Sequence, residues 1–183
     1  MRRRAESQGE TRRRIVEAAL QLHRMLGPAR TPLSAVAAAA GVQRHTLYRH
    51  FPTPESLFKA CGEHFAATSG RPDPARWSEL PATRERARVI LADLYAWYAG
   101  NADAVGRALR DSDQVPVGSG VHNLQAAAVD LLAGRAQRRR AAARMMVSFG
   151  AWSALTEDGA MAPAAAAKLA AEMLEAATPS RHR

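Results

Sequence analysis

The sequence predicts an all-α fold, and three observations support that prediction. Alanine is abundant, β-branched residues are sparse, and apolar residues recur at spacings of three and four. These are the marks of helices that bury one face. A chain of 183 residues is long enough for one or two small domains with an apolar core. We expect about nine helices in all.

Capping and stop signals place four helices in the first third of the chain. Thr11 can cap the first helix, and Gly27-Pro28 ends it. Thr31-Pro32 and Thr53-Pro54 each combine a capping hydroxyl with a first-turn proline. The expected helices cover residues 11–26, 33–40, 44–50 and 54–68.

Five further helices are expected in the rest of the chain, at residues 82–99, 101–110, 121–134, 136–157 and 163–177. Two segments rich in Gly or Pro separate them, a linker at 69–74 and a polar, mobile loop at 111–120. We therefore divide the chain into a flexible basic arm (1–10), an N-terminal domain (11–52) and a C-terminal domain (53–183).

Positive charge is concentrated near the N-terminus. The chain has 26 Lys and Arg against 17 Asp and Glu, a net charge of +9, and residues 1–62 hold eleven of the basic residues but only four of the acidic ones. A local excess of this kind suits a polyanion such as nucleic acid. A general arginine bias that aids solubility is the alternative explanation.

Several functional classes are not expected. A lone Cys61 excludes a disulfide framework, and no Cys and His residues have the spacing of a zinc site, so we expect neither metal nor cofactor. No run approaches the roughly 18 apolar residues of a membrane span, and no signal peptide is evident, so we expect a cytoplasmic protein without membrane contact. Cys61 with His64 is the nearest approach to a nucleophile, but a packed cysteine explains it better, and an enzyme is not expected.

Residues 33–51 have the spacing of a helix-turn-helix. Two short helices that cross steeply need a small residue at their contact, which Ala37 provides. Gly41 can adopt the left-handed turn, and Leu47 returns an apolar side chain to the core.

Four motifs carry a resemblance to a known family: RIVEAAL at 14–20, TPLSAVA at 31–37, AGV at 40–42 and TLYRHF at 46–51. In this order they resemble the TetR family of bacterial transcriptional regulators over about residues 11–65. Toward the C-terminus, FGAWSAL at 149–155 and PAAAAKL at 163–169 are similar to the last two helices of the family's ligand-binding and dimerisation domain.

The resemblance implies a three-helix DNA-binding domain followed by a helical domain for effector binding and dimerisation. A homodimer would bind a palindromic operator in double-stranded DNA, most simply as a repressor that a small-molecule effector releases. One reading module per chain independently requires two copies for two half-sites. The alternative is a DNA-binding adaptor or architectural protein without an effector.

The resemblance places the DNA contacts around the second helix of the motif. Arg44 is expected to read guanine and Gln43 adenine, and the alternative is that one or more of Gln43, Arg44 and His45 contact only phosphate. Thr46 and Tyr48 match DNA-facing positions of the family, with a core role as the alternative for Tyr48. Arg49 and His50 would contact phosphates, or His50 would cap the helix end. The full expected set is Ser34, Gln43, Arg44, His45, Thr46, Tyr48, Arg49 and His50.

Two positions depart from the family pattern. Pro54 stands where the family often has a phosphate-binding Lys, which leaves the amides at that helix start to bind phosphate. Ser34 has a shorter reach than the usual Arg or Thr. An N-terminal arm with Arg2, Arg3, Arg4 and Arg12 can compensate by entering a minor groove, or it is a solvated tail.

In the C-terminal domain two groups are expected to act, with core packing as the alternative for each. A mainly apolar or aromatic effector would meet Leu94, Tyr95, Tyr98, Arg107, His122 and Phe149. A dimer interface of helices would involve Met145, Met146, Trp152, Leu169 and Met173.

Overall fold

The computed structural model describes the backbone of residues 2–177 and the side chains of residues 6–177. Within that range every regular element is helical, which confirms the predicted fold class. The chain divides into two compact units. Unit 1 comprises the residues up to Ser69 together with Asp103–Gly120, and unit 2 comprises Gly70–Ala102 and the chain from Val121 onward.

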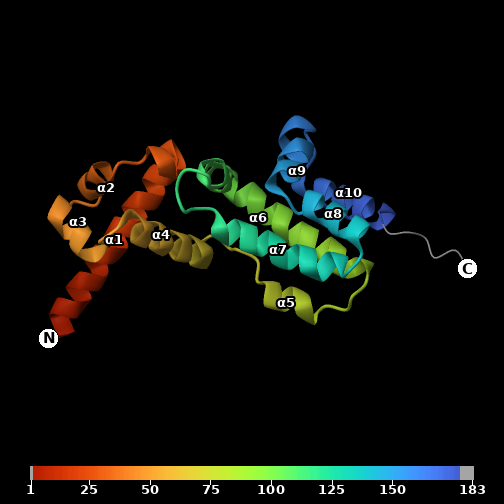
Figure 1. The fold of residues 1–183 in the computed structure, drawn as a ribbon, viewed down its shortest axis with the longest axis horizontal. Helices are drawn as coiled ribbons and strands as arrows, with labels where there is room; N and C mark the ends of the chain where they lie inside the picture. The colour runs from red at the N-terminus through yellow and green to blue at the C-terminus, as the bar shows by residue number, and fades with distance from the viewer. Residues whose placement is uncertain (1, 178–183) are drawn as a thin grey trace, which may run out of the picture. The chain divides into compact units, whose positions relative to one another are not determined.

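Unit 1 contains the predicted helix-turn-helix. In Figure 1, α2 lies beside α1, and α4 packs on α1 further along. The apolar faces of these helices meet in one core, whose most deeply buried members include Ile15, Ala19, Val36, Leu47, Phe51 and Leu57. The elements are α1 (Arg2–Leu26), the 3₁₀ turn η1 (Pro28–Arg30), α2 (Leu33–Ala39), α3 (Arg44–His50) and α4 (Pro54–Thr68).

The first helix begins at Arg2 and not near Thr11 as expected. Thr11 does not cap it, because its hydroxyl donates to the carbonyl of Ser7 inside the helix. Arg13 pairs with Glu10 one turn before it and Glu17 one turn after it, at 2.7 and 3.0 Å. Such pairs stabilise a helix locally. The early turns of α1 are therefore helical where an arm was expected.

Unit 2 is built from helices of the C-terminal part of the chain, among which α10 packs against α8 and α9 (Figure 1). Its core includes Leu91, Leu94, Tyr95, Tyr98, Leu124, Trp152 and Leu174. The elements are α5 (Pro74–Glu79), α6 (Arg84–Asp111), α7 (Ser119–Ala133), α8 (Gln137–Met146), α9 (Phe149–Ser153), the π-helical turn η2 (Ala154–Asp158) and α10 (Pro163–Ala176). The end of α6 and the start of α7 lie in unit 1.

Helix α5 was not predicted. Asp73 caps it, because its carboxylate accepts a hydrogen bond from the amide of Ala75 at 2.9 Å. Trp77 then inserts into the core of unit 2, and its indole N–H donates to Asp93 at 2.8 Å. The Asp-Pro start signal was present at residues 73–74, but the segment is too short to show an apolar period.

Two other boundaries differ from the prediction. The helices expected at 82–99 and 101–110 form one helix, α6, with non-helical backbone at Asn101 (φ −136°, ψ 21°). The single helix expected at 136–157 breaks after Met146, and Ser148 caps α9. The hydroxyls of Tyr95 and Tyr98 donate to the carbonyls of Met146 and Val147 at 3.0 and 2.8 Å. These bonds satisfy carbonyls left free at the end of α8, which stabilises the break.

Candidate nucleic-acid interface

The turn between α2 and α3 is closed by backbone hydrogen bonds. Val42 N–H donates to Ala37 O, and Gly41 N–H donates to Ala38 O, each at 3.0 Å. This pair of bonds is a Schellman motif, which requires a left-handed residue. Gly41 provides it with φ +63°, and a Cβ there would meet no other atom within 4 Å, so backbone conformation alone requires glycine.

The two helices of the motif are held by the residues that the sequence singled out. Ala37 is buried where α2 faces the core, and Leu47 of α3 is fully buried in the same cluster. With Leu47 directed inward, the opposite face of α3 is directed outward. The burial of Ala37 and Leu47 and the positive φ of Gly41 are compatible with the packing roles expected for these residues.

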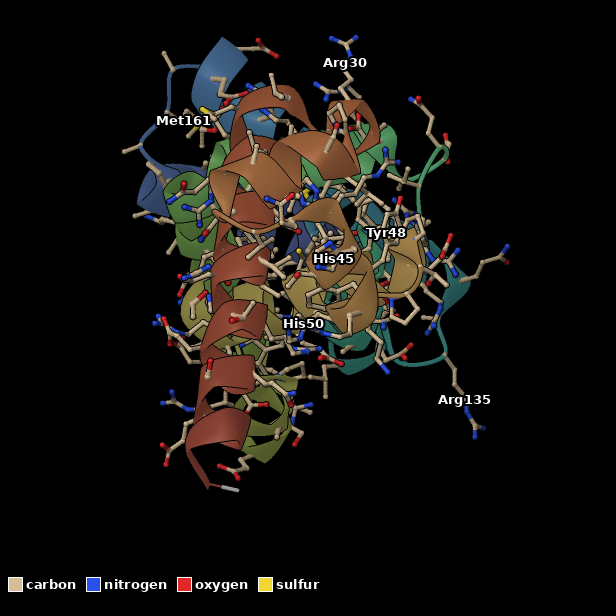
Figure 2. The ribbon with its side chains drawn as sticks, turned by 90° about the vertical axis from the view of Figure 1, so that its left-hand side faces the viewer. Arg30, His45, Tyr48, His50, Arg135 and Met161 are labelled. Carbon is tan, nitrogen blue, oxygen red and sulfur yellow. The ribbon has the colours of Figure 1, made fainter. Side chains whose placement is uncertain are left out.

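The outward face of α3 carries most of the predicted DNA-binding residues. Gln43 precedes the helix, and its side chain makes no capping hydrogen bond. Figure 2 shows His45, Tyr48 and His50 along α3. In the expected set Thr46 and His50 are half-buried, while the exposed members are Ser34 on α2 together with Gln43, Arg44, His45, Tyr48 and Arg49.

Arg44 and Tyr48 lie one helical turn apart and touch. The guanidinium carbon is 5.6 Å from the centre of the Tyr48 ring, and Nη2 donates to the Tyr48 hydroxyl at 3.4 Å. Both contacts are exposed and weak, so they orient the guanidinium without immobilising it. Arg44 is therefore held over the outer face of α3 at little energetic cost.

His50 is less suited to phosphate than expected. Partial burial, together with the charges of Arg49 and Arg12, lowers the pKa of His50, so the ring is neutral at physiological pH. Its Nε2 is buried and has no hydrogen-bond partner among the described residues. The Arg12 guanidinium lies 4.8 Å over the ring of Phe51, next to His50. Arg12 thus packs on the end of α3 and is not part of a free arm.

Other arginines of α1 are also engaged within unit 1. Arg14 donates to the carbonyl of Ala40 at 3.1 Å, which ties α1 to the end of α2. Arg13 is paired with acidic residues of its own helix. The side chains of Arg2, Arg3 and Arg4 lie outside the described residues. The basic excess of the N-terminal region is therefore partly engaged in contacts within unit 1, and Arg44 and Arg49 of α3 are among the cations that remain exposed.

The start of α4 does not offer free amides to a phosphate. Thr53 and Ser56 form a capping box in which each side chain accepts a hydrogen bond from the other's backbone N–H. The pKa of Glu55 is lowered, first by a hydrogen bond from its own backbone amide and then by Thr53. A capped, negatively charged helix start disfavours an anion, so the phosphate contact expected beside Pro54 is not supported.

Cys61 is placed for packing and not for chemistry. It is buried in the core of unit 1, where its thiol lies 4.0 Å from the carbonyl of Val16. Burial, opposed by the charge of Arg12, raises the pKa of Cys61 to about 12. A nucleophilic cysteine needs the thiolate, so Cys61 is a core residue. In the described part of the chain no three His, Cys, Asp or Glu side chains group as metal ligands. No helix there has the length and apolarity to cross a membrane.

An aromatic cluster in unit 2 contains part of the expected effector site. The ring of Tyr98 meets Phe149 edge-on at 5.4 Å and Trp152 at 6.0 Å. Leu94 and Tyr95 are buried on the same helix. Burial raises the pKa of Tyr98 to about 12, against a hydrogen bond from Gln125, so the phenol stays neutral.

Two members of the expected effector site are not part of this cluster. Arg107 lies in unit 1, and His122 is exposed to solvent at the start of α7. Trp152 was expected at a dimer interface, but its indole N–H is buried in the cluster without a partner among the described residues. The concentration of aromatic residues in the segments that form α6 and α9 was the sequence signal that could have placed Trp152 in this cluster.

The residues expected at the dimer interface differ in their exposure to solvent. Met145 on α8 and Met173 on α10 are 63% and 47% exposed. Met146 and Trp152 are buried within unit 2, and Leu169 is half-buried. Core packing, the alternative considered for this group, accounts for Met146 and Trp152. The exposed methionines are the members still available to a partner.

Residues 15–61 match the profile of a family described as bacterial regulatory proteins, tetR family. A search of functionally curated proteins finds no match to the sequence. The predicted resemblance to the TetR family is thus confirmed for the region that contains the helix-turn-helix.

Solved structures with the same fold cover nearly all of the chain. A protein of Mesorhizobium loti MAFF303099 assigned to the TetR-family transcriptional regulators has a TM-score of 0.63 at 18% identity, over 93% of this chain and 96% of that one. The multidrug binding protein EbrR, solved with malachite green, has a TM-score of 0.60 at 20% identity, over 92% of this chain and 98% of that one. The transcriptional regulator FadR from Bacillus subtilis, solved with stearoyl-CoA, has a TM-score of 0.57 at 17% identity, over 91% of this chain and 98% of that one. At these identities the likeness shows the fold.

Proposed function

Because residues 15–61 match the TetR family and the whole chain has the fold of TetR-family regulators, we propose that this protein is a sequence-specific, DNA-binding transcriptional regulator of the cytoplasm. One observation carries the proposal. Helix α3 is anchored by Leu47 and presents Gln43, Arg44 and His45 at its exposed N-terminal end. Helices of this motif read base edges in the major groove with their N-terminal residues.

Within this function we assign roles by reach and charge. Arg44, oriented by Tyr48, forms a bidentate pair with guanine, and Gln43, whose side chain caps nothing, reads adenine. Arg49 contacts the phosphate backbone as an exposed cation. His50 acts at most as a neutral hydrogen-bonding group.

Two copies of the chain are needed for a palindromic operator. Met145 and Met173 are exposed on α8 and α10, which pack against each other in unit 2. Two such helices from each protomer can form a four-helix interface. We therefore place the dimer contact on this face, with the homodimer binding successive half-sites.

An effector of mainly apolar or aromatic character fits the cluster around Tyr98. The hydroxyls of Tyr95 and Tyr98 donate to backbone carbonyls, whereas the indole N–H of Trp152 is a buried donor of this cluster without a hydrogen-bond partner among the described residues. An apolar ligand with one hydrogen-bond acceptor would satisfy it. EbrR and FadR were solved with malachite green and stearoyl-CoA, which supports ligand control as against an adaptor without an effector. Release of the operator on binding would make the protein a repressor.

The DNA-binding function is tested by selecting sequences from a random duplex pool with the purified protein. The affinities of two variants for the selected site and for an unrelated duplex are then compared. Arg44→Ala should weaken specific binding by about 1–3 kcal/mol and change non-specific binding little. Arg24→Ala, an equal loss of charge at an exposed position on α1, is the matched control and should lower both modestly. Equal losses for the two variants would contradict base reading by Arg44, and a pool without enrichment would favour the adaptor.

Effector control is tested by titrating the protein with malachite green and following tryptophan fluorescence. Binding within the cluster should quench Trp97 and Trp152, and Phe149→Ala should abolish the response because it removes a ring of the cluster. Trp77 belongs to α5 and, among the described residues, makes no ring contact with the cluster, so the variant Trp77→Phe serves as the control that retains the response. Quenching that Phe149→Ala leaves unchanged would place the ligand elsewhere.

A further inference from the structure

Asp111, the last residue of α6, is a buried carboxylate that the proposed function does not use. It is 2% exposed and is the charged residue most completely buried among those described. A negative charge at a helix C-terminus is opposed by the helix dipole. Its position therefore depends on contacts outside its own helix.

Those contacts lie at the connection between α1 and α2. Asp111 Oδ2 accepts a hydrogen bond from the backbone N–H of Ala29 at 3.0 Å, across 82 residues of sequence. Its Oδ1 accepts from Nε of Arg110 at 2.9 Å. Burial acts to raise the pKa of Asp111, but these hydrogen bonds and the charges of Arg110 and Arg30 outweigh it and lower the pKa. The carboxylate is thus ionised. The side chain of Arg30 itself extends away from the chain (Figure 2).

Gly27 makes this approach possible. Its φ is +92°, and a Cβ built there would lie 2.6 Å from Asp111 Oδ2 and 2.6 Å from Arg110 Nη2. Real Cβ atoms do not come this close to another heavy atom, so a side chain at residue 27 would displace the Asp111 carboxylate, and the positive φ is a backbone conformation that L side chains rarely adopt. Thr31 then donates from its hydroxyl to the carbonyl of Gly27 at 2.7 Å, which closes the connection.

This connection leads directly into the helix-turn-helix. Thr31 is followed by Pro32, whose carbonyl accepts the first hydrogen bonds of α2, from Ala35 and Val36. The segment of α6 from Asp103 onward belongs to the same compact unit as α1–α4, and the non-helical backbone at Asn101 lies just before it. A carboxylate on α6 therefore holds the residues from which α2 starts.

We propose that Asp111 is a positioning residue that couples the end of α6 to the recognition helix by holding the α1–α2 connection. Displacement of the last turns of α6 then moves the start of α2, and with it α3. The DNA-binding consequence rests on the proposed function, whereas the coupling itself is a property of unit 1. Asp111 contacts no DNA and acts through the backbone of residues 27–32.

The coupling is tested by amide hydrogen exchange measured residue by residue on the full-length protein. Ala29 N–H should exchange about tenfold or more faster in Asp111→Ala, as expected when a hydrogen bond to a charged group is lost. Asp111→Asn retains an acceptor and should restore part of the protection. Gly27→Ala keeps the carboxylate but displaces it, and should resemble Asp111→Ala. Asp113→Ala, at an exposed aspartate two residues away, is the matched control and should match the wild type.

The consequence is tested on duplexes selected by the wild type. Asp111→Ala should bind the selected site about tenfold more weakly, with Asp111→Asn intermediate, while non-specific binding at low salt is retained. A merely structural role would instead lower both kinds of binding together with the thermal midpoint. An Ala29 amide that exchanges equally in wild type and Asp111→Ala would overturn the proposal. If the wild type selects no sequence, the proposed function fails, and the exchange data still decide the coupling.

Discussion

His23 is a histidine whose surroundings in unit 1 favour the neutral ring. It is half-buried on α1, where its ring centre lies 5.6 Å from that of Phe58. Burial lowers the pKa of His23 to about 4, although the Asp111 carboxylate acts to raise it. The unfolded chain therefore binds a proton at this residue at a higher pH than the folded chain does. The free energy of unfolding must fall as the pH drops from about 6.5 toward 4.

We predict that His23→Gln removes part of this acid sensitivity. The lost stability is at most about 3 kcal/mol, and less because the ring is only partly buried. Urea unfolding midpoints at pH 7 and pH 5 measure it, and they should lie closer together in the variant. His122→Gln, at an exposed histidine, is the control and should keep the wild-type difference. Asp111 contributes at lower pH, since a lowered carboxyl pKa adds stability that is lost only as that group is protonated.

Residue by residue, the candidate site was predictable where exposure follows from local geometry. The seven residues of α3 have one buried member, Leu47, and once it is assigned inward the outward positions follow from the helical period. The engagement of Arg12 with Phe51 and of Arg14 with Ala40 was not predictable, because both contacts are made to other helices. Sequence charge therefore overstated the number of free cations.

At the level of elements, α4 depends on its cap. Thr53 Oγ1 accepts a hydrogen bond from Ser56 N–H at 3.2 Å, and Pro54 occupies the first turn, where its missing N–H is not needed. The first turn of α4 carries Leu57 into the core of unit 1. Loss of the cap should therefore lower the stability of the whole unit.

We predict that Thr53→Ala destabilises the protein by about 1 kcal/mol and lowers the thermal unfolding midpoint. Thr68→Ala, at the other end of the same helix, is the matched control. Its hydroxyl donates only to the carbonyl of His64 on the exposed surface. Its loss should change stability by less than about 0.5 kcal/mol. Equal destabilisation by the two variants, measured by calorimetry, would argue against the cap.

At the level of the whole molecule, the two units carry different exposed apolar residues. Met25 on α1 and Met145 on α8 are each 63% exposed, and α8 packs against α10, which carries another exposed methionine, Met173. Scattered single apolar residues are ordinary, whereas apolar residues gathered on paired helices indicate an interface. The proposed dimer should therefore depend on unit 2.

We predict that Met145→Glu converts a dimer to a monomer, because a charge at the centre of a helical interface would be buried without a partner. Sedimentation velocity at micromolar protein concentration measures the change. Met25→Glu introduces the same charge at an equally exposed methionine of unit 1, and should leave the oligomeric state unaltered. A variant at Met145 that sediments as the wild type does would exclude α8 from the interface.

The all-α fold, the bounds of α3 and α4 and the turn at Gly41 were determined by the sequence itself. Capping hydroxyls, first-turn prolines and a left-handed glycine act over a few residues, so their effect is independent of the remaining fold. The break after Met146, the continuity of α6 and the burial of Asp111 were decided only by tertiary structure. At the break, the carbonyls of Met146 and Val147 accept hydrogen bonds from Tyr95 and Tyr98, which are 51 and 49 residues away. The Asp111 carboxylate accepts one from Ala29, which is 82 residues away. A periodic pattern identifies which face of a helix is buried, but not which distant group satisfies its polar atoms.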